Sequence, residues 1–217
     1  MPQPLKLPVS VEFAPVALLR RPQLAAHIGV VVGIWSQIEV NLGTLLAALI
    51  GAEAKTVLAI YLSLTSAPAQ RAVIEAAANL RLNHEQRSRL SKLLILIGKR
   101  GKERNLLVHA SWGISDAYPD ALIWADPKDL LEKGLIEIED YRIDERFDLA
   151  RVGQKVLVVQ RRYRSYTEED FRRIEERLSA ALSDLTEFSA IFIEHWLGFE
   201  RRPLATLPLP AESPPLD

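Results

Sequence analysis

The chain has 217 residues, of which 48% are hydrophobic and 25% charged, a composition ordinary for one soluble globular domain. Because it contains no cysteine, disulfide bonds, thiolate metal sites and cysteine nucleophiles are excluded. Its formal net charge of −1 argues against a generally basic surface that coats nucleic acid.

The two ends of the chain are rich in proline and lack helical periodicity. We predict an extended N-terminal tail over residues 1–19 and a proline-rich C-terminal tail over residues 201–217, because proline interrupts helices. The first eight residues lack the continuous apolar core of a signal peptide. Together with the absence of cysteine, this predicts a cytoplasmic protein without membrane attachment.

A long helix is predicted from Pro22 to about Ile50, with proline in its first turn and a glycine directly after it. Its apolar stripe comprises Ile28, Val31, Val32, Trp35, Leu42, Leu45, Leu46 and Leu49. Glu39 falls on the same stripe, so we expect its carboxylate to be buried. Because a charge at the centre of a bilayer costs roughly 2.5–3.5 kcal/mol, burial in a bundle or dimer is favoured over a membrane span. Gly29 and Gly33 share one helix face, which favours close packing against another helix.

Two shorter helices are predicted next, over residues 53–64 and 68–82. A fourth helix is expected to begin after Asn83, whose side chain can cap the first turn while Gln86 caps it in return. This helix carries a basic segment, in which residues 81–104 hold eight arginines and lysines against two glutamates. Such a segment suits either a local phosphate contact or a solvated helix face.

The character of the sequence changes after residue 112. Segments 121–125, 135–143 and 155–166 contain β-branched and aromatic residues that partly alternate with charged ones. Turn signals separate these segments at Tyr118-Pro119-Asp120 and Val152-Gly153-Gln154. We therefore predict a small antiparallel β-meander within an insertion over residues 113–166.

A final helix is expected after Thr167, which forms a capping box with Asp170. Apolar residues at helical spacing then line one face: Phe171, Ile174, Leu178, Ala181, Leu182, Leu185, Phe188, Phe192 and Trp196. The predicted fold class is mainly α, an antiparallel helical bundle formed by residues 20–112 and 167–200 with the β-meander inserted before the last helix.

The residues with most chemical promise lie at the end of the basic helix. Asn105 and His109 are four residues apart, so their side chains share one helix face. Arg104 can reach a bound phosphate, which a planar guanidinium binds through two hydrogen bonds. Histidine titrates near neutral pH and can transfer a proton during catalysis. These three groups could together cleave RNA without a metal ion.

This Arg-Asn-x-x-x-His run at the end of a basic helix, in a bundle whose first helix carries Trp35 and Glu39, resembles the HEPN superfamily. The resemblance covers roughly residues 22–112 and 167–199, and it implies an antiparallel helical homodimer with both motifs facing one cleft. It also implies metal-independent endoribonuclease activity, often in toxins or antiviral-defence effectors that have an antitoxin or defence-system partner protein.

Carried over to this chain, the resemblance implies catalytic roles for Arg104, Asn105 and His109. Glu39 matches the acidic or polar residue that some members supply from an earlier helix. The neighbouring Lys99, Arg100 and Lys102 are expected to bind RNA. We expect no cofactor and no metal, because no histidines have ligand spacing and the pair Glu137 and Glu139 suits a solvated strand better than an ion site.

Other interpretations of the same residues remain open. His109 could instead be a helix-end histidine hydrogen-bonded to a carbonyl, and Arg104 could form an ion pair with Glu39. The resemblance implies a motif in which four to six residues separate arginine and histidine. Arg21 and His27, five residues apart in this sense, also fit it, but at a helix start and without the asparagine.

Two alternative functions also remain open. One is a non-catalytic helical module for dimerisation or for binding a partner protein or nucleotide. The other is an antitoxin or immunity protein whose acidic segment 116–148 mimics nucleic acid. One further segment also allows two interpretations. It contains Arg161, Arg162 and Arg164 interleaved with Tyr163 and Tyr166, which suits either a solvated edge strand or an RNA-stacking surface.

Overall fold

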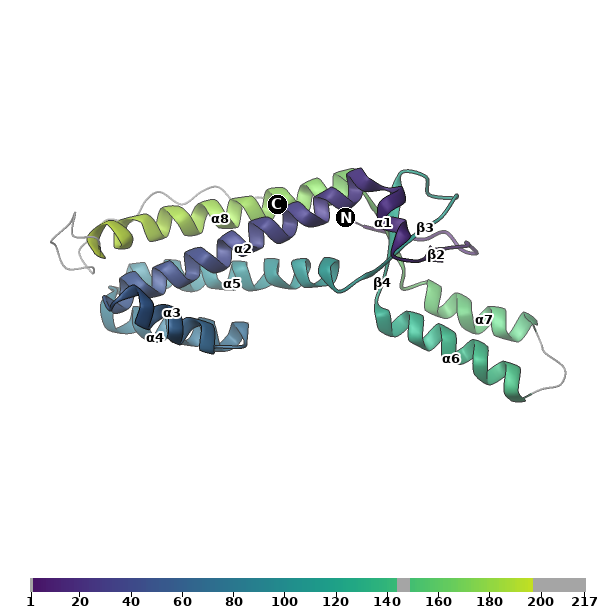
Figure 1. Cartoon of the computed structure of the whole chain (residues 1–217), viewed down its shortest axis with the longest axis horizontal. Coiled ribbons are helices and arrows are strands. Elements are labelled where there is room, and N and C mark those ends of the chain that lie inside the picture. The colour runs from purple at the N-terminus through teal and green to yellow at the C-terminus, as the bar shows by residue number, and fades with distance from the viewer. Residues whose placement is uncertain (1, 144–148, 197–217) are drawn as a thin grey trace. The chain divides into compact units, whose positions relative to one another are not determined.

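A computed structural model describes residues 2–143 and 149–196, which form a mainly helical protein with one small antiparallel sheet (Figure 1). The predicted fold class is therefore confirmed at this level. The predicted C-terminal tail, residues 201–217, lies outside the described residues.

The chain divides into two compact units. One comprises Met1–Val31 and Glu103–Glu175, and the other comprises Val32–Lys102 and Glu176–Asp217. Three long helices contribute residues to both units: α2 (Pro22–Ile50), α5 (His84–Val108) and α8 (Glu168–Trp196). The division thus falls within helices rather than at the ends of the predicted insertion.

In the second unit, α2 and α5 are joined through α3 (Ala54–Ser63) and α4 (Ala67–Arg81). The predicted helix signals are confirmed at both ends of α2, since Pro22 is its first residue and Gly51 adopts a positive φ of 69°. The α5 capping box is also present, because the backbone N–H of Gln86 donates to Asn83 Oδ1 at 2.9 Å and that of Asn83 donates to Gln86 Oε1 at 3.0 Å.

The core of the second unit shows where two helices approach closely. A Cβ added to Gly101 on α5 would lie 2.7 Å from the ring of Trp35 on α2, so only glycine fits there. Gly29 and Gly33 have open space around them instead, so the close helix packing expected of them is not formed with another described part of the chain. On α8 the predicted apolar face is confirmed, with Leu185, Phe188 and others fully buried.

The first unit is built on a five-stranded antiparallel sheet. Its strand order is β1 (Gln3–Pro4), β5 (Arg164–Thr167), β4 (Ala121–Ala125), β3 (Ser111–Ile114) and β2 (Glu12–Phe13), and the short helix α1 (Val16–Arg20) follows β2. The segment expected to form an extended N-terminal tail therefore supplies both edge strands of the sheet. The edge pairs are Gln3 with Ser165 and Glu12 with Ile114.

Of the three predicted meander strands, one is confirmed, one is wrong and one is correct only at its end. The strand predicted over 121–125 is β4, whereas residues 135–143 belong to α6 (Pro127–Ile143). In the third segment, residues 155–160 belong to α7 (Leu149–Gln160) and residues 164–166 lie in β5. Helices α6 and α7 run side by side as a hairpin (Figure 1). The start of α6 favours a helix over a strand, because proline occupies its first position and Asp126 caps it by accepting the backbone N–H of Lys128.

The sheet is covered on both faces, which explains why its central strand β4 is almost continuously apolar. On one face Ile123 and Ala125 form a cluster with Val159 of α7 and with Tyr163. On the other face Trp112 contacts the rings of Tyr166 and Phe171, with centroids 5.5 and 5.8 Å apart.

Within the described residues, α2 is the one helix long and apolar enough to span a membrane by length and composition, with a mean hydropathy of 1.4. About a third of its most apolar window is buried within the chain, at 33%. A core helix of a soluble protein meets the same criteria.

Candidate functional site

The three candidate catalytic residues, Arg104, Asn105 and His109, lie where α5 ends and β3 begins, within the first unit. The helix ends at Val108, and the backbone N–H of His109 still donates to the carbonyl of Asn105 at 3.1 Å. This bond places the two residues one helical turn apart, as predicted from their spacing.

Two tryptophans from the sheet fix this helix end. The last carbonyls of a helix have no partner within the helix. Here the indole N–H of Trp124 on β4 donates to the carbonyl of Leu106 at 2.7 Å, and that of Trp112 on β3 donates to the carbonyl of Leu107 at 3.2 Å. The sheet therefore sets the position of the turn that carries Asn105 and His109.

Arg104 and Asn105 contact each other directly. Arg104 Nη1 donates to Asn105 Oδ1 at 3.0 Å. Asn105 is exposed, whereas Arg104 is half-buried and its buried Nε has no hydrogen-bond partner among the described residues. An unsatisfied buried donor is costly unless a ligand or water pairs with it. The amide thus holds the guanidinium through Nη1, and since Nε is closed off from solvent, an anion would have to be bound by the Nη atoms.

His109 lies exposed in the turn after α5. Its imidazole makes no hydrogen bond or ion pair with any residue that the structure describes, so the alternative of a ring bonded to a helix-end carbonyl is not observed there. A solvent-facing imidazole at this place is accessible to a substrate. His27, the histidine of the other Arg-to-His match in the sequence, is engaged within the chain instead. Its Nδ1 lies 2.7 Å from Glu175 Oε1, and its ring stacks on Phe171.

Glu39 does not occupy the buried position expected from the apolar stripe. It is exposed on α2, and its neighbour Ile38 is fully buried in its place, although Val31 and the leucines of the predicted stripe are buried as expected. Burial, together with the charge of Glu39, raises the pKa of Tyr61 to about 12. Glu39 and Arg104 belong to different units, and a supporting role for Glu39 stays a prediction.

The three basic residues expected to bind RNA differ in their surroundings. Lys99 and Lys102 are exposed on α5. Arg100 is half-buried and already engaged in an interaction within the chain. The two lysines are therefore better placed than Arg100 to contact a phosphate in solution.

An open pocket of about 650 Å³ lies beside this helix end and was not predicted. Leu106 lines it together with Trp124, Arg164 and Tyr166 of the sheet and with the first turns of α6. Its lining comes from segments far apart in the sequence, from Pro2 near the N-terminus to Tyr166 on β5. The one local signal in the sequence is Trp124 with Asp126 two residues later, at the end of the strand predicted over 121–125.

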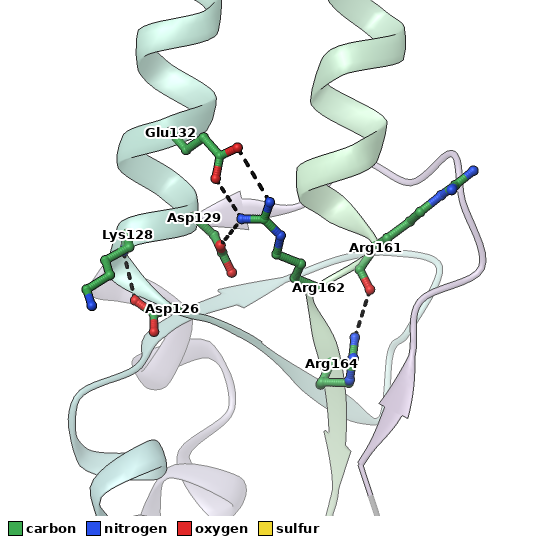
Figure 2. Close-up of polar contacts among 7 residues, drawn as sticks. All are labelled: Asp126, Lys128, Asp129, Glu132, Arg161, Arg162 and Arg164. Carbon is green, nitrogen blue, oxygen red and sulfur yellow. Dashed lines mark hydrogen bonds and ion pairs between the residues drawn. The ribbon is translucent and has the colours of Figure 1, made fainter.

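Figure 2 shows an ion-pair network at the edge of this pocket. Arg162 Nη1 lies 2.8 Å from Asp129 Oδ1 and 2.6 Å from Glu132 Oε2, linking the end of α7 to the start of α6. Hydrogen bonds to Asp129 and Glu132 raise the pKa of Arg162 further above its ordinary value. One guanidinium thus pairs with both carboxylates, which leaves these three groups with a net charge of −1.

The expectation of an edge strand or an RNA-stacking surface at residues 161–166 is wrong on both counts. Strand β5 lies between β1 and β4, and Tyr163 and Tyr166 are buried, so neither ring is available to stack on a base. Burial is the main reason why the pKa of each tyrosine is raised to about 12.

Comparisons with protein-family models, curated proteins and solved structures found no match for this chain.

Proposed function

We propose that the chain is a metal-independent endoribonuclease of the HEPN type that acts as a homodimer. The observation that carries this proposal is the exposed end of α5, where Asn105 holds the guanidinium of Arg104 and His109 lies one turn further on. These groups supply the anion binding and proton transfer that RNA cleavage requires.

The chemistry uses the 2′-hydroxyl of RNA as nucleophile. His109 removes the 2′-hydroxyl proton, the 2′-oxygen bonds to phosphorus, and Arg104 stabilises the pentacoordinate phosphorane through its charge. The bond from phosphorus to the 5′-oxygen then breaks, and that oxygen takes up a proton. The products are a 2′,3′-cyclic phosphate and a 5′-hydroxyl.

A homodimer supplies what one site lacks, because one imidazole cannot be base and acid in the same step. In a dimer with both motifs facing one cleft, His109 of a second protomer protonates the leaving oxygen. Supporting this arrangement, no described residue lies within 4 Å of a Cβ added to Gly29 or Gly33 on α2, and Val30 and Val40 on the same helix are 48% and 60% exposed. Small and apolar residues on one helix suit close approach of a second helix.

The HEPN resemblance further suggests a biological setting. A ribonuclease of this type would act in the cytoplasm as a toxin or an antiviral-defence effector, restrained or activated by a partner protein. Lys99 and Lys102 would contact the RNA backbone, and no cofactor would be needed.

The test is RNA cleavage in EDTA by purified wild type, His109→Ala and Arg104→Ala. Matched controls are His84→Ala and Arg87→Ala, an exposed histidine and a half-buried arginine near the other end of the same helix. We expect cleavage by wild type and both controls, and a loss of at least about 100-fold in each site variant. Equal cleavage by wild type and His109→Ala would contradict the proposal.

A second candidate is a non-catalytic module that binds a partner protein or nucleotide. The pocket beside α5 favours it, because that pocket could hold a ligand without any chemistry at His109. In that case no variant, wild type included, cleaves RNA, while ligand binding persists in His109→Ala.

A further inference from the structure

The pocket beside the end of α5 has an aromatic wall set by the sheet. Trp124 on β4 and Arg164 on β5 are directly opposed in the antiparallel register, so both side chains lie on the same face of the sheet. Trp124 is only half-buried and lines the pocket, although its indole N–H is fixed to Leu106. A rigid, partly open indole is a surface on which a flat ring can stack.

Of the three carboxylates that line the pocket, only that of Asp126 forms no ion pair with a described residue. Asp129 and Glu132 are both paired with Arg162 (Figure 2). Asp126 Oδ1 accepts the backbone N–H of Lys128 at 2.9 Å and keeps a second lone pair, and Oδ2 has no partner among the described residues, so the carboxylate can accept from two adjacent donors. The pocket therefore presents a hydrogen-bond acceptor next to an aromatic surface.

The pocket adjoins the candidate catalytic groups through the backbone of α5. Leu106 lines the pocket and accepts the hydrogen bond of Trp124, and it directly follows Asn105 in the chain. A nucleotide whose base occupied this pocket would have its phosphate near the end of α5.

We propose that this pocket binds a guanine base of the RNA, with Trp124 stacking on the ring and Asp126 accepting hydrogen bonds from its edge. Guanine is the RNA base that places two donors, N1–H and the N2 amino group, side by side on its Watson–Crick edge. Adenine and cytosine place an acceptor beside their amino group, and uracil flanks its one donor with carbonyls, so each opposes a carboxylate. This inference rests on the proposed function and gives it a substrate preference.

Binding is tested with the full chain by titrating guanosine, adenosine, cytidine and uridine 5′-monophosphates. The readout is the indole N–H resonance of Trp124 in nuclear magnetic resonance, assigned by its disappearance in Trp124→Phe. We expect saturable shifts with the guanosine nucleotide, at least about tenfold tighter than with the other three.

The decisive variant is Asp126→Asn, because asparagine still caps α6 but replaces one acceptor by an amide donor. We expect guanosine binding to weaken by about tenfold or more and the preference over adenosine to be lost. Asp120→Asn, at an exposed aspartate in the turn before β4, should bind like wild type. Equal binding of all four nucleotides, or unchanged preference in Asp126→Asn, would overturn the proposal.

Failure of this inference is distinguishable from failure of the proposed function. RNA cleavage without guanosine binding would overturn the guanine pocket while leaving the ribonuclease intact. Guanosine binding that depends on Asp126, with no cleavage by wild type, would support the pocket and overturn the ribonuclease.

Discussion

At the scale of single residues, two glycines of α5 allow the effect of side-chain packing on stability to be separated from that of helix propensity. Gly98 is exposed with nothing within 4 Å of an added Cβ, whereas a Cβ at Gly101 would lie 2.7 Å from the ring of Trp35. Gly98→Ala should therefore raise the free energy of unfolding by about 0.5–1 kcal/mol through helix propensity. Gly101→Ala should lower it by about 1–3 kcal/mol through overpacking.

The measurement is urea denaturation of both variants beside wild type, followed by circular dichroism. Each variant is the control for the other, since both make the same change in the same helix. Equal stabilisation by the two alanines would mean that the Trp35 ring moves aside at no cost.

The candidate site also shows what residue patterns can reveal. The spacing of Asn105 and His109 was sufficient to predict that they lie one helical turn apart, because a helical turn depends only on residues close in sequence. The exposure of Glu39 was not predictable from the stripe, since the burial of Ile38 in its place depends on the helices packed around α2. The pocket was missed because Leu106, Trp124 and Arg164 meet only through the sheet.

At the scale of elements, helix starts were predicted best. Caps depend on three or four consecutive residues, and those of α5 and α8 are formed as expected, with the backbone N–H of Thr167 donating to Asp170 Oδ2 at 3.2 Å. Helices α6 and α7 were mistaken for strands because their Val, Ile and Leu residues suit either structure. The outcome depends on Val159 and Leu130 packing against the sheet.

The α5 cap makes a testable contribution to stability. Asn83→Ala removes the acceptor of the Gln86 N–H and should lower the free energy of unfolding by about 1 kcal/mol. Ser88→Ala, an exposed position in the second turn of the same helix, is the control and should change stability by less than about 0.5 kcal/mol. Thermal denaturation compares them, and equal effects would show that the capping box does not stabilise α5.

At the scale of the whole molecule, the central expectation is a homodimer formed through α2. Gly33→Glu adds a charge at an exposed position where the chain leaves open space, so the protomer should still fold. We expect light scattering to report a dimer for wild type and a monomer for Gly33→Glu.

Gly134→Glu is the matched control, because its glycine also has open space but lies on α6. It should remain dimeric, and circular dichroism should show both variants to be as helical as wild type. A monomeric wild type at micromolar concentration, or a dimeric Gly33→Glu, would contradict assembly through this helix.

The most direct measurement of the central claim is the chemical identity of the RNA ends left by wild type in EDTA, determined by mass spectrometry. Attack by the 2′-hydroxyl, with His109 and Arg104 as the working groups, predicts 2′,3′-cyclic phosphate and 5′-hydroxyl ends. Products with 3′-hydroxyl and 5′-phosphate ends would contradict the account, since they require water rather than the 2′-hydroxyl as nucleophile.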